Sequence, residues 1–230
     1  MGTLYIVATP IGNLDDLTPR ALETLKKVKL ILAEDTRVTA KLLHVKEIAT
    51  PMRSFHQHSS DKVIEKVIEQ LSAGDDIALV SDAGTPGIND PGGVLIEGIL
   101  QARPDAHVVP IPGSNAAVTA LSIAGFPADR FAYLGFVPNK KGRQTFFREL
   151  TERPETQVFY ESKHRIIRAL EQLVEAFSEA EQSERSVVVA RELTKQFETI
   201  YRGTAEEILA QLIDGETRGE FVVVVSPRKR

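Results

Sequence analysis

Cysteine is absent from the sequence of 230 residues, which excludes a disulfide framework, thiolate metal ligands and thiol catalysis. No apolar stretch approaches the length that a membrane span needs. Met1–Ala8 passes into a strand-like run without a basic leader. Hydrophobic residues make up 42% of the chain and charged residues 26%, which allows a buried core. We therefore expect a soluble, cytoplasmic protein of one large or two compact domains.

A basic excess is also missing. The chain has 28 lysines and arginines against 32 acidic residues, a net charge of −4, whereas general nucleic-acid binders are strongly basic. An RNA partner would have to be held by a local patch or reached within a preorganised particle. Asn139–Arg143 and Lys163–Arg165 are such local clusters, and each is equally compatible with a solvated surface.

Two glycine motifs of nucleotide-phosphate sites are absent. Neither G-x-G-x-x-G nor G-x-x-x-x-G-K-[ST] occurs. The sequence therefore does not predict a polyphosphate site of either kind.

The first half alternates strand-like and helix-like segments, which is typical of a parallel sheet with helical crossovers. The apolar run Ile77–Val80 predicts a strand buried on both faces. The expected strands are Thr3–Ala8, Lys29–Glu34, Met52–Phe55, Ile77–Val80 and His107–Ile111. The expected helices are Pro19–Val28 behind a Thr18 cap, Thr36–His44, Asp61–Ala73 behind a Ser60 cap, and one from Asp90-Pro91 to Ala102.

The second half has a different organisation. Only Leu193–Gln196 separates two of its strands, which is too short for a crossover and predicts an antiparallel pair. We expect a helix over Ser114–Ala124 and a mixed sheet. Its expected strands are Phe131–Phe136, Gln157–Tyr160, Val187–Glu192, Phe197–Tyr201 and Phe221–Val225. The glycine and prolines near residue 112 place the domain boundary there, with an N-terminal α/β domain over 1–112 and a C-terminal one over 113–230.

Three glycine- and proline-rich loops follow strands of the first half: Thr9–Asn13, Ser81–Gly93 and Pro112–Ala116. Ligands bind beyond the carboxyl ends of strands in an open parallel sheet, so these loops predict a ligand site. The middle loop has Asp82 and Asp90 but no basic residue, which suits ribose hydroxyls and a cationic centre better than phosphates. S-adenosylmethionine has these features, although physics alone leaves the choice of ligand open.

Several long motifs resemble one known family. They are Leu4–Leu14, Ala33–Arg37, Ser81–Pro91, Phe159–Ser162, Ala190–Lys195 and Gly219–Val222. Together they are similar to the ribosomal RNA small-subunit methyltransferase I family, within the tetrapyrrole-methylase-like superfamily. Two motifs depart from the family pattern. The junction reads Gly113-Ser114-Asn115-Ala116 in place of glycine-proline-serine-alanine, and Lys163 stands in place of a proline. Many relatives also continue with a small further domain that could hold RNA, beyond the position of Arg230.

The resemblance implies two α/β domains of the class III methyltransferase fold, with S-adenosylmethionine between them. It implies 2′-O-methylation of a cytidine ribose in the decoding region of small-subunit (16S) ribosomal RNA, and a homodimer. The cofactor contacts that it implies are Pro10, Gly12, Asp82, Ala83, Gly84, Thr85, Ser114, Asn115, Ala116, Phe159, Tyr160, Arg191 and Glu220.

A ribose hydroxyl is a weak nucleophile, so a positioned base would assist its attack. Asp35 is the first candidate and Glu34 the second, because both follow a strand at the ligand edge. Asp35 is equally suited to cap the helix that starts at Thr36. Arg37, His56, Lys163 and His164 are candidate RNA contacts. His56 and His58 flank Gln57, but further metal ligands are not apparent, so we expect no metal site.

Two other functions fit the same sequence. A C-methyltransferase acting on a tetrapyrrole precursor would use the same kind of cofactor site. A non-catalytic ribosome-binding protein is the second alternative, although costly glycine conformations would be expected to erode in such a protein.

Overall fold

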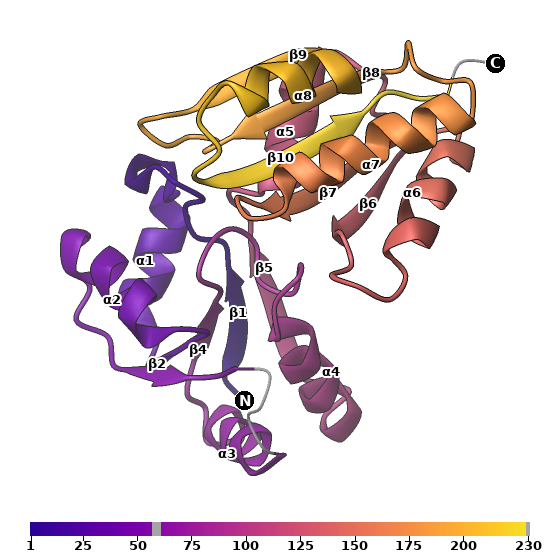
Figure 1. Cartoon of the computed structure of the whole chain (residues 1–230). Helices are drawn as coiled ribbons and strands as arrows, with labels where there is room; N and C mark the ends of the chain where they lie inside the picture. The colour runs from indigo at the N-terminus through magenta and orange to yellow at the C-terminus, as the bar shows by residue number, and fades with distance from the viewer. Residues whose placement is uncertain (57–60, 229–230) are drawn as a thin grey trace. The chain divides into compact units, whose positions relative to one another are not determined.

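The computed structural model describes residues 1–56 and 61–228 (Figure 1). The expected Ser60 cap lies outside this part of the chain. Contacts divide the protein into two compact units, Met1–Asn115 and Ala116–Arg230, and each is described by itself. Within the described residues, every helix is too short or too polar to cross a bilayer.

The first unit is built on a parallel sheet, as the alternating pattern predicts. Its strand order is β3-β2-β4-β1-β5, and all four neighbouring pairs are parallel. β2 and β4 are buried along their whole length because helices cover both faces of the sheet. The strands are β1 (Thr3–Val7), β2 (Leu30–Ala33), β3 (Met52–Ser54), β4 (Ile77–Val80) and β5 (His107–Ile111).

Two helices cover each face of this sheet (Figure 1). Val7, Ala33 and Val80 pack with α1 (Pro19–Lys27) and α2 (Thr36–Val45). The alternate positions Leu32 and Leu79 pack with α3 (Asp61–Ser72) and α4 (Gly92–Ala102). A short 3₁₀ turn, η1 (Leu14–Asp16), precedes α1. Because each helix is reached from a strand end, the four connecting loops leave from the carboxyl edge of the sheet.

The second unit has a mixed sheet, again as expected, in the order β6-β7-β10-β8-β9. β6 and β7 are parallel, and the other neighbouring pairs are antiparallel. The short turn between β8 and β9 therefore joins antiparallel neighbours, which confirms the prediction from Leu193–Gln196. The strands are β6 (Phe131–Phe136), β7 (Thr156–Ser162), β8 (Ser186–Arg191), β9 (Thr199–Thr204) and β10 (Glu220–Val225).

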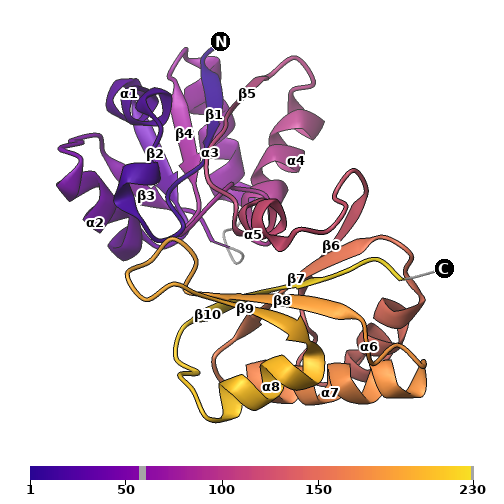
Figure 2. The ribbon, with the colours of Figure 1, turned by 90° about the horizontal axis from the view of Figure 1, so that it is seen from above.

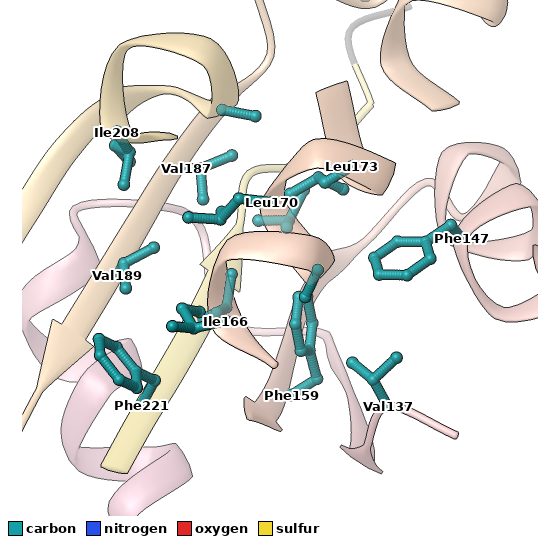
Figure 3. Packing of buried hydrophobic residues seen from close by; sticks show 14 of the residues in the cluster. Val137, Phe147, Phe159, Ile166, Leu170, Leu173, Val187, Val189, Ile208 and Phe221 are labelled. Carbon is teal, nitrogen blue, oxygen red and sulfur yellow. The ribbon is translucent and has the colours of Figure 1, made fainter. Parts of the chain in front are cut away.

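Three helices, α6 (Arg143–Glu152), α7 (Ile166–Glu179) and α8 (Ala205–Ile213), cover one face of this sheet, and α5 (Ala116–Ala124) covers the other (Figure 2). The larger core lies on the three-helix side (Figure 3). It includes Phe147, Phe159, Leu170, Phe177 and Phe221.

Three expected starts were wrong by two residues. α4 begins at Gly92 because the Asp90 carboxylate accepts from the backbone N–H groups of Gly87 and Gly92 and so belongs to the loop. α5 begins at Ala116, two residues after Ser114. β9 begins at Thr199 because the preceding turn extends through Phe197, whose carbonyl accepts from Arg191.

Candidate functional site

Three loops at the carboxyl edge of the first sheet are joined by hydrogen bonds. The backbones of Thr9 and Gly84 exchange two bonds, with N···O distances of 2.9 and 3.1 Å. The Thr85 hydroxyl donates to the Ser114 carbonyl at 3.1 Å. The loops after β1, β4 and β5 are thus held against one another, as their place in a parallel sheet predicts.

The segment after β2 joins the same set through carboxylates. The Asp35 backbone N–H donates to Asp82 Oδ1 at 2.9 Å. The Asp82 N–H in turn donates to Glu34 Oε2 at 3.5 Å. Four strand ends therefore converge at one rim, which we call the acidic edge and define by Glu34, Asp35 and Asp82.

Two glycines allow the loops to approach this closely. A Cβ on Gly113 would lie 2.9 Å from the Ala8 Cβ, which is closer than van der Waals contact permits. Gly84 has a φ of +82°, a left-handed conformation that favours glycine. Nearby, Pro10 is buried and Gly12 is exposed.

The carboxyls of Glu34 and Asp82 ionise less readily than free carboxyls do. Partial burial raises the pKa of the Glu34 carboxyl, and the neighbouring Asp82 charge raises it further. Burial also raises the pKa of Asp82, and the charges of Asp35 and Asp90 act in the same direction. Within residues 1–56 and 61–228, neither carboxylate forms an ion pair with a lysine or arginine. A bound cation or hydroxyl donor would therefore stabilise both groups.

Asp35 has a different environment although it is the next residue. Its Oδ2 lies 2.6 Å from Arg37 Nη2, and its Oδ1 accepts from the Arg37 backbone N–H at 2.8 Å. These bonds to Arg37 lower the pKa of Asp35 to about 2. Asp35 is thus the N-cap of α2, and such an acidic carboxyl is a weak proton acceptor. Between the two candidate bases, the geometry favours Glu34.

The cofactor contact that the resemblance implies for Phe159 stays a prediction. The Phe159 ring is buried in the core (Figure 3) and lies edge-to-face against Phe146, with centroids 5.5 Å apart. Successive side chains of a strand point to opposite faces, so Tyr160 lies on the other side of β7. The Tyr160 hydroxyl accepts from the Ala117 backbone N–H at 3.1 Å, and burial raises its pKa.

Arg191 and Glu220 are held by their own neighbours. Arg191 is buried, and its Nε and Nη1 donate to the carbonyls of Arg218 and Phe197 at 2.7 and 3.0 Å. Glu220 is exposed and pairs with Lys195 at 2.9 Å. Arg191 therefore anchors two turns, and a cofactor role for either residue stays a prediction.

The predicted RNA contacts are all at the surface. The Arg37 side chain is 88% exposed but is bound to Asp35. His56 in the first unit, and Lys163 and His164 in the second, are also exposed. His58 lies outside the described residues. Ser114, Asn115 and Ala116 are half-buried, whereas Ala83 is exposed.

Sequence reasoning missed a buried ionic cluster in the second unit. The Glu161 carboxylate is fully buried and lies 2.8 Å from Arg165 Nη2 and 3.4 Å from Arg143 Nη1. It also accepts from the Ser162 N–H at 2.7 Å. Glu161 and Arg165 lie four residues apart in the sequence, but nothing in the sequence indicated that Arg143 joins them.

Comparisons with known proteins agree with this architecture. The model of the tetrapyrrole (corrin/porphyrin) methylase family matches residues 3–209. Ribosomal RNA small subunit methyltransferase I of Escherichia coli O157:H7 is 48% identical, covering 99% of this chain and 79% of that protein. The protein of the same name from Synechocystis sp. is 45% identical, covering 98% of this chain and 79% of that protein.

Solved structures show the same fold at low identity. Uroporphyrin-III-C-methyltransferase from Thermus thermophilus matches with a TM-score of 0.65 and 20% identity, over 98% of this chain and 94% of that one. Diphthine synthase matches with a TM-score of 0.71 and 13% identity, over 98% of this chain and 90% of that one. By the family match and by near-full-length identity, this chain belongs to the tetrapyrrole methylases and, within them, to the ribosomal RNA small subunit methyltransferase I family.

Proposed function

We propose that this protein uses S-adenosylmethionine to methylate small-subunit (16S) ribosomal RNA, at the ribose 2′-hydroxyl of a cytidine in the decoding region. The observation that carries the proposal is the 45–48% identity to methyltransferases named for small-subunit rRNA, over 98–99% of the chain. The acidic edge supports it, because its converging loops carry motifs that resemble the same family. We also propose a homodimer, as the resemblance implies, and a cytoplasmic location, as the composition predicts.

The acidic edge fits the proposed cofactor. Glu34 and Asp82 lack a cationic partner among the described residues. A sulfonium charge would offset the burial of Asp82, and a hydroxyl donor would offset that of Glu34. Gly84 and Gly113 keep the backbone of the adjoining loops close and free of side chains. When bound, S-adenosylmethionine supplies an electrophilic methyl group. Within the first unit, the proposed contacts are Pro10, Gly12, Asp82, Ala83, Gly84, Thr85, Ser114 and Asn115.

Glu34 is the proposed general base. A raised pKa makes a carboxylate a better proton acceptor near neutral pH, and the pKa of Glu34 is raised. Its role is to accept the proton of the attacking ribose hydroxyl as the oxygen–methyl bond forms. Asp35 instead holds the N-terminus of α2 in place beside Asp82. Alignment of the acceptor with the donor supplies the rest of the rate enhancement, since orientation alone is worth several kcal/mol.

The test is a label-transfer assay with three acceptors. Purified protein and methyl-labelled S-adenosylmethionine are incubated with unmodified small ribosomal subunits, with free 16S rRNA and with a porphyrinogen. We expect label on the ribose of one cytidine in the rRNA. Label on the porphyrinogen alone would replace this proposal with tetrapyrrole C-methylation. Tight cofactor binding without label on any acceptor would support a non-catalytic ribosome-binding protein.

A further inference from the structure

The second unit has its own carboxyl edge, formed by the parallel strands β6 and β7. The loops that leave these strands, 137–142 and 163–165, are joined by two arginines. Arg165 Nη1 donates to the Val137 carbonyl at 3.2 Å and also contacts the Asn139 side chain. Arg143 Nη1 donates to the Pro138 carbonyl at 3.2 Å. We call these two loops together with Phe136 the β6–β7 edge.

This edge carries excess positive charge. Lys140, Lys141, Lys163 and His164 are exposed. Arg143 and Arg165 share the single carboxylate of Glu161, which leaves one positive charge in excess.

Arg143 is incompletely satisfied in this cluster. Its Nη2 is buried and has no hydrogen-bond partner among the described residues. Burial lowers the pKa of Arg143, and the charges of Arg168 and Arg165 lower it further. The edge therefore attracts anions, although the chain as a whole carries −4.

Two helices add to this field. α6, with ten residues, and α7, with fourteen, start directly after the two loops. Their N-cap residues, Gly142 and Arg165, make no side-chain capping bond. The uncapped backbone N–H groups and the positive ends of the helix dipoles both favour a negatively charged ligand.

An exposed aromatic ring ends the strand that leads into loop 137–142. Phe136, the last residue of β6, is 50% exposed. A register shift after Tyr133, with Gly135 at a φ of +64°, places Phe136 opposite Tyr160 in the sheet. The two rings meet edge-to-face with centroids 5.5 Å apart, and Tyr160 is fixed in turn by its bond from Ala117. The Phe136 ring is therefore held in place by Tyr160 and is half-exposed to solvent.

We propose that the β6–β7 edge binds an unpaired segment of RNA. A base stacks on Phe136, and Lys140, Lys141 and Lys163 contact the phosphates. Stacking platforms beside cationic grooves are how proteins hold single strands, and sequence-specific RNA recognition targets unpaired bases. Glu161 is a positioning residue, since it holds the two arginines that fix loop 137–142. The inference rests on the proposed function for the identity of the nucleic acid.

The test measures the affinity of the full chain for an unpaired cytidine-rich RNA of about 12 nucleotides by fluorescence anisotropy. We expect Phe136→Ala to bind roughly five- to a hundred-fold more weakly. Phe131→Ala is the matched control, because Phe131 lies at the other end of β6 and is 43% exposed; it should bind as the wild type does. Phe136→Leu keeps apolar volume without a ring, so it tests stacking if the alanine variant folds poorly.

The phosphate contacts are tested by salt dependence. Replacing Lys140 and Lys141 with glutamine should reduce the slope of log affinity against log salt by about 1.4, since each single-strand phosphate contact contributes about 0.7. Lys26→Gln with Lys27→Gln, in α1 of the first unit, removes the same charge and should leave the slope unchanged.

Other results would overturn the inference. Unchanged RNA affinity in both Phe136 variants and an unchanged salt slope in the lysine variant would do so. Equal competition by a duplex RNA of the same length would contradict the preference for an unpaired segment. The proposed function is separable from this outcome. If wild-type protein binds RNA through Phe136 but transfers no label to rRNA, only the proposed function fails.

Discussion

Glu34 and Asp35 are neighbours in the chain but differ in what they can do. Asp35 has both carboxylate oxygens bound to Arg37, so its proton affinity is low. Glu34 faces Asp82 instead, and both acids resist ionisation. The difference comes from which side chain reaches a cation, which the sequence Glu34-Asp35-Thr36-Arg37 does not reveal. The sequence alone favours Asp35 as the first candidate base.

The charge of Asp82 is expected to contribute to cofactor affinity. Asp82→Asn keeps the acceptor oxygen for the Asp35 N–H and removes the charge. We expect S-adenosylmethionine to bind about tenfold more weakly, the equivalent of about 1.4 kcal/mol, as measured by calorimetry. The fold should not be weakened, because repulsion from Glu34 is relieved. Asp105→Asn, at an exposed pair with Arg103, is the control, and equal affinity in the two variants would remove Asp82 from the site.

Glu34 and Asp82 on one side, and Asp35 on the other, predict opposite changes of stability with pH. The raised pKa values of Glu34 and Asp82 mean that the native state loses stability as pH rises from ordinary carboxyl values through the raised ones. The lowered pKa of Asp35 gives stability above its ordinary value of 3.8, lost as pH falls toward about 2. We expect Asp35→Asn to flatten the acid loss of stability between about pH 4 and 2, followed by urea unfolding. An unchanged acid limb would contradict the Asp35–Arg37 pair.

Glu161 is expected to be the costliest carboxylate to remove. Its deletion in Glu161→Ala leaves Arg143 buried without an opposite charge. Breaking a buried pair in this way costs about 3–5 kcal/mol, to be measured by denaturant unfolding. Glu23→Ala breaks an exposed pair with Lys27 at 3.9 Å and should cost about 0.5 kcal/mol or less. Similar losses in the two variants would show that the Glu161 cluster does not stabilise the second unit.

At the scale of elements, continuous apolar runs were the most predictable part of the fold. The bounds of β4, β5 and β6 agree with the sequence pattern. β4 is buried along its whole length inside its sheet, where a strand has few alternatives, whereas β5 and β6 are edge strands. The predicted starts of α4, α5 and β9 were wrong, and for α4 and β9 a side chain competes with the helix or strand. Asp90 captures two loop N–H groups, and Arg191 extends a turn through Phe197. Such contacts depend on the folded loop and leave no periodic signal.

The sequence predicted which loops form the candidate site, but not where each side chain of the site points. Loops at the carboxyl ends of parallel strands were expected to meet, and hydrogen bonds join those of the first unit. The family motif did not distinguish Phe159, which enters the core, from Tyr160, which does not. The sequence predicted the β6–β7 edge as two separate basic clusters, Asn139–Arg143 and Lys163–Arg165. It did not indicate that they meet at Glu161, since Arg143 and Arg165 lie 22 residues apart.

Close loop packing at the first sheet predicts a strong effect of one methyl group. Gly113→Ala would bring a Cβ to 2.9 Å from the Ala8 Cβ, and overpacking of this kind costs about 1–3 kcal/mol. We expect lower stability in thermal unfolding together with weaker cofactor binding. Gly93→Ala is the control, because nothing lies within 4 Å of its added Cβ and it is in α4. That variant should be stabilised by about 0.5–1 kcal/mol, and a loss as large as that of Gly113→Ala would contradict the packing argument.

For the molecule as a whole, the net charge of −4 does not reveal that one edge is acidic and another is basic. The carboxyl edge of the first unit is acidic, with Glu34 and Asp82, and suits a cationic cofactor. The corresponding edge of the second unit is basic, with Lys140, Lys141 and Lys163, and suits an anionic polymer. A chain with both surfaces can act on RNA although its net charge of −4 lacks the basic excess of general nucleic-acid binders.

The most direct test of the account compares single-turnover methyl transfer to unmodified small subunits by wild-type protein, Glu34→Gln and Asp35→Asn. Loss of a general base should slow Glu34→Gln by about 10²- to 10⁴-fold, with donor affinity measured separately. Asp35→Asn retains an acceptor for the α2 N-terminus and should lose far less. A normal rate in Glu34→Gln together with a large loss of rate in Asp35→Asn would contradict the general-base role of Glu34.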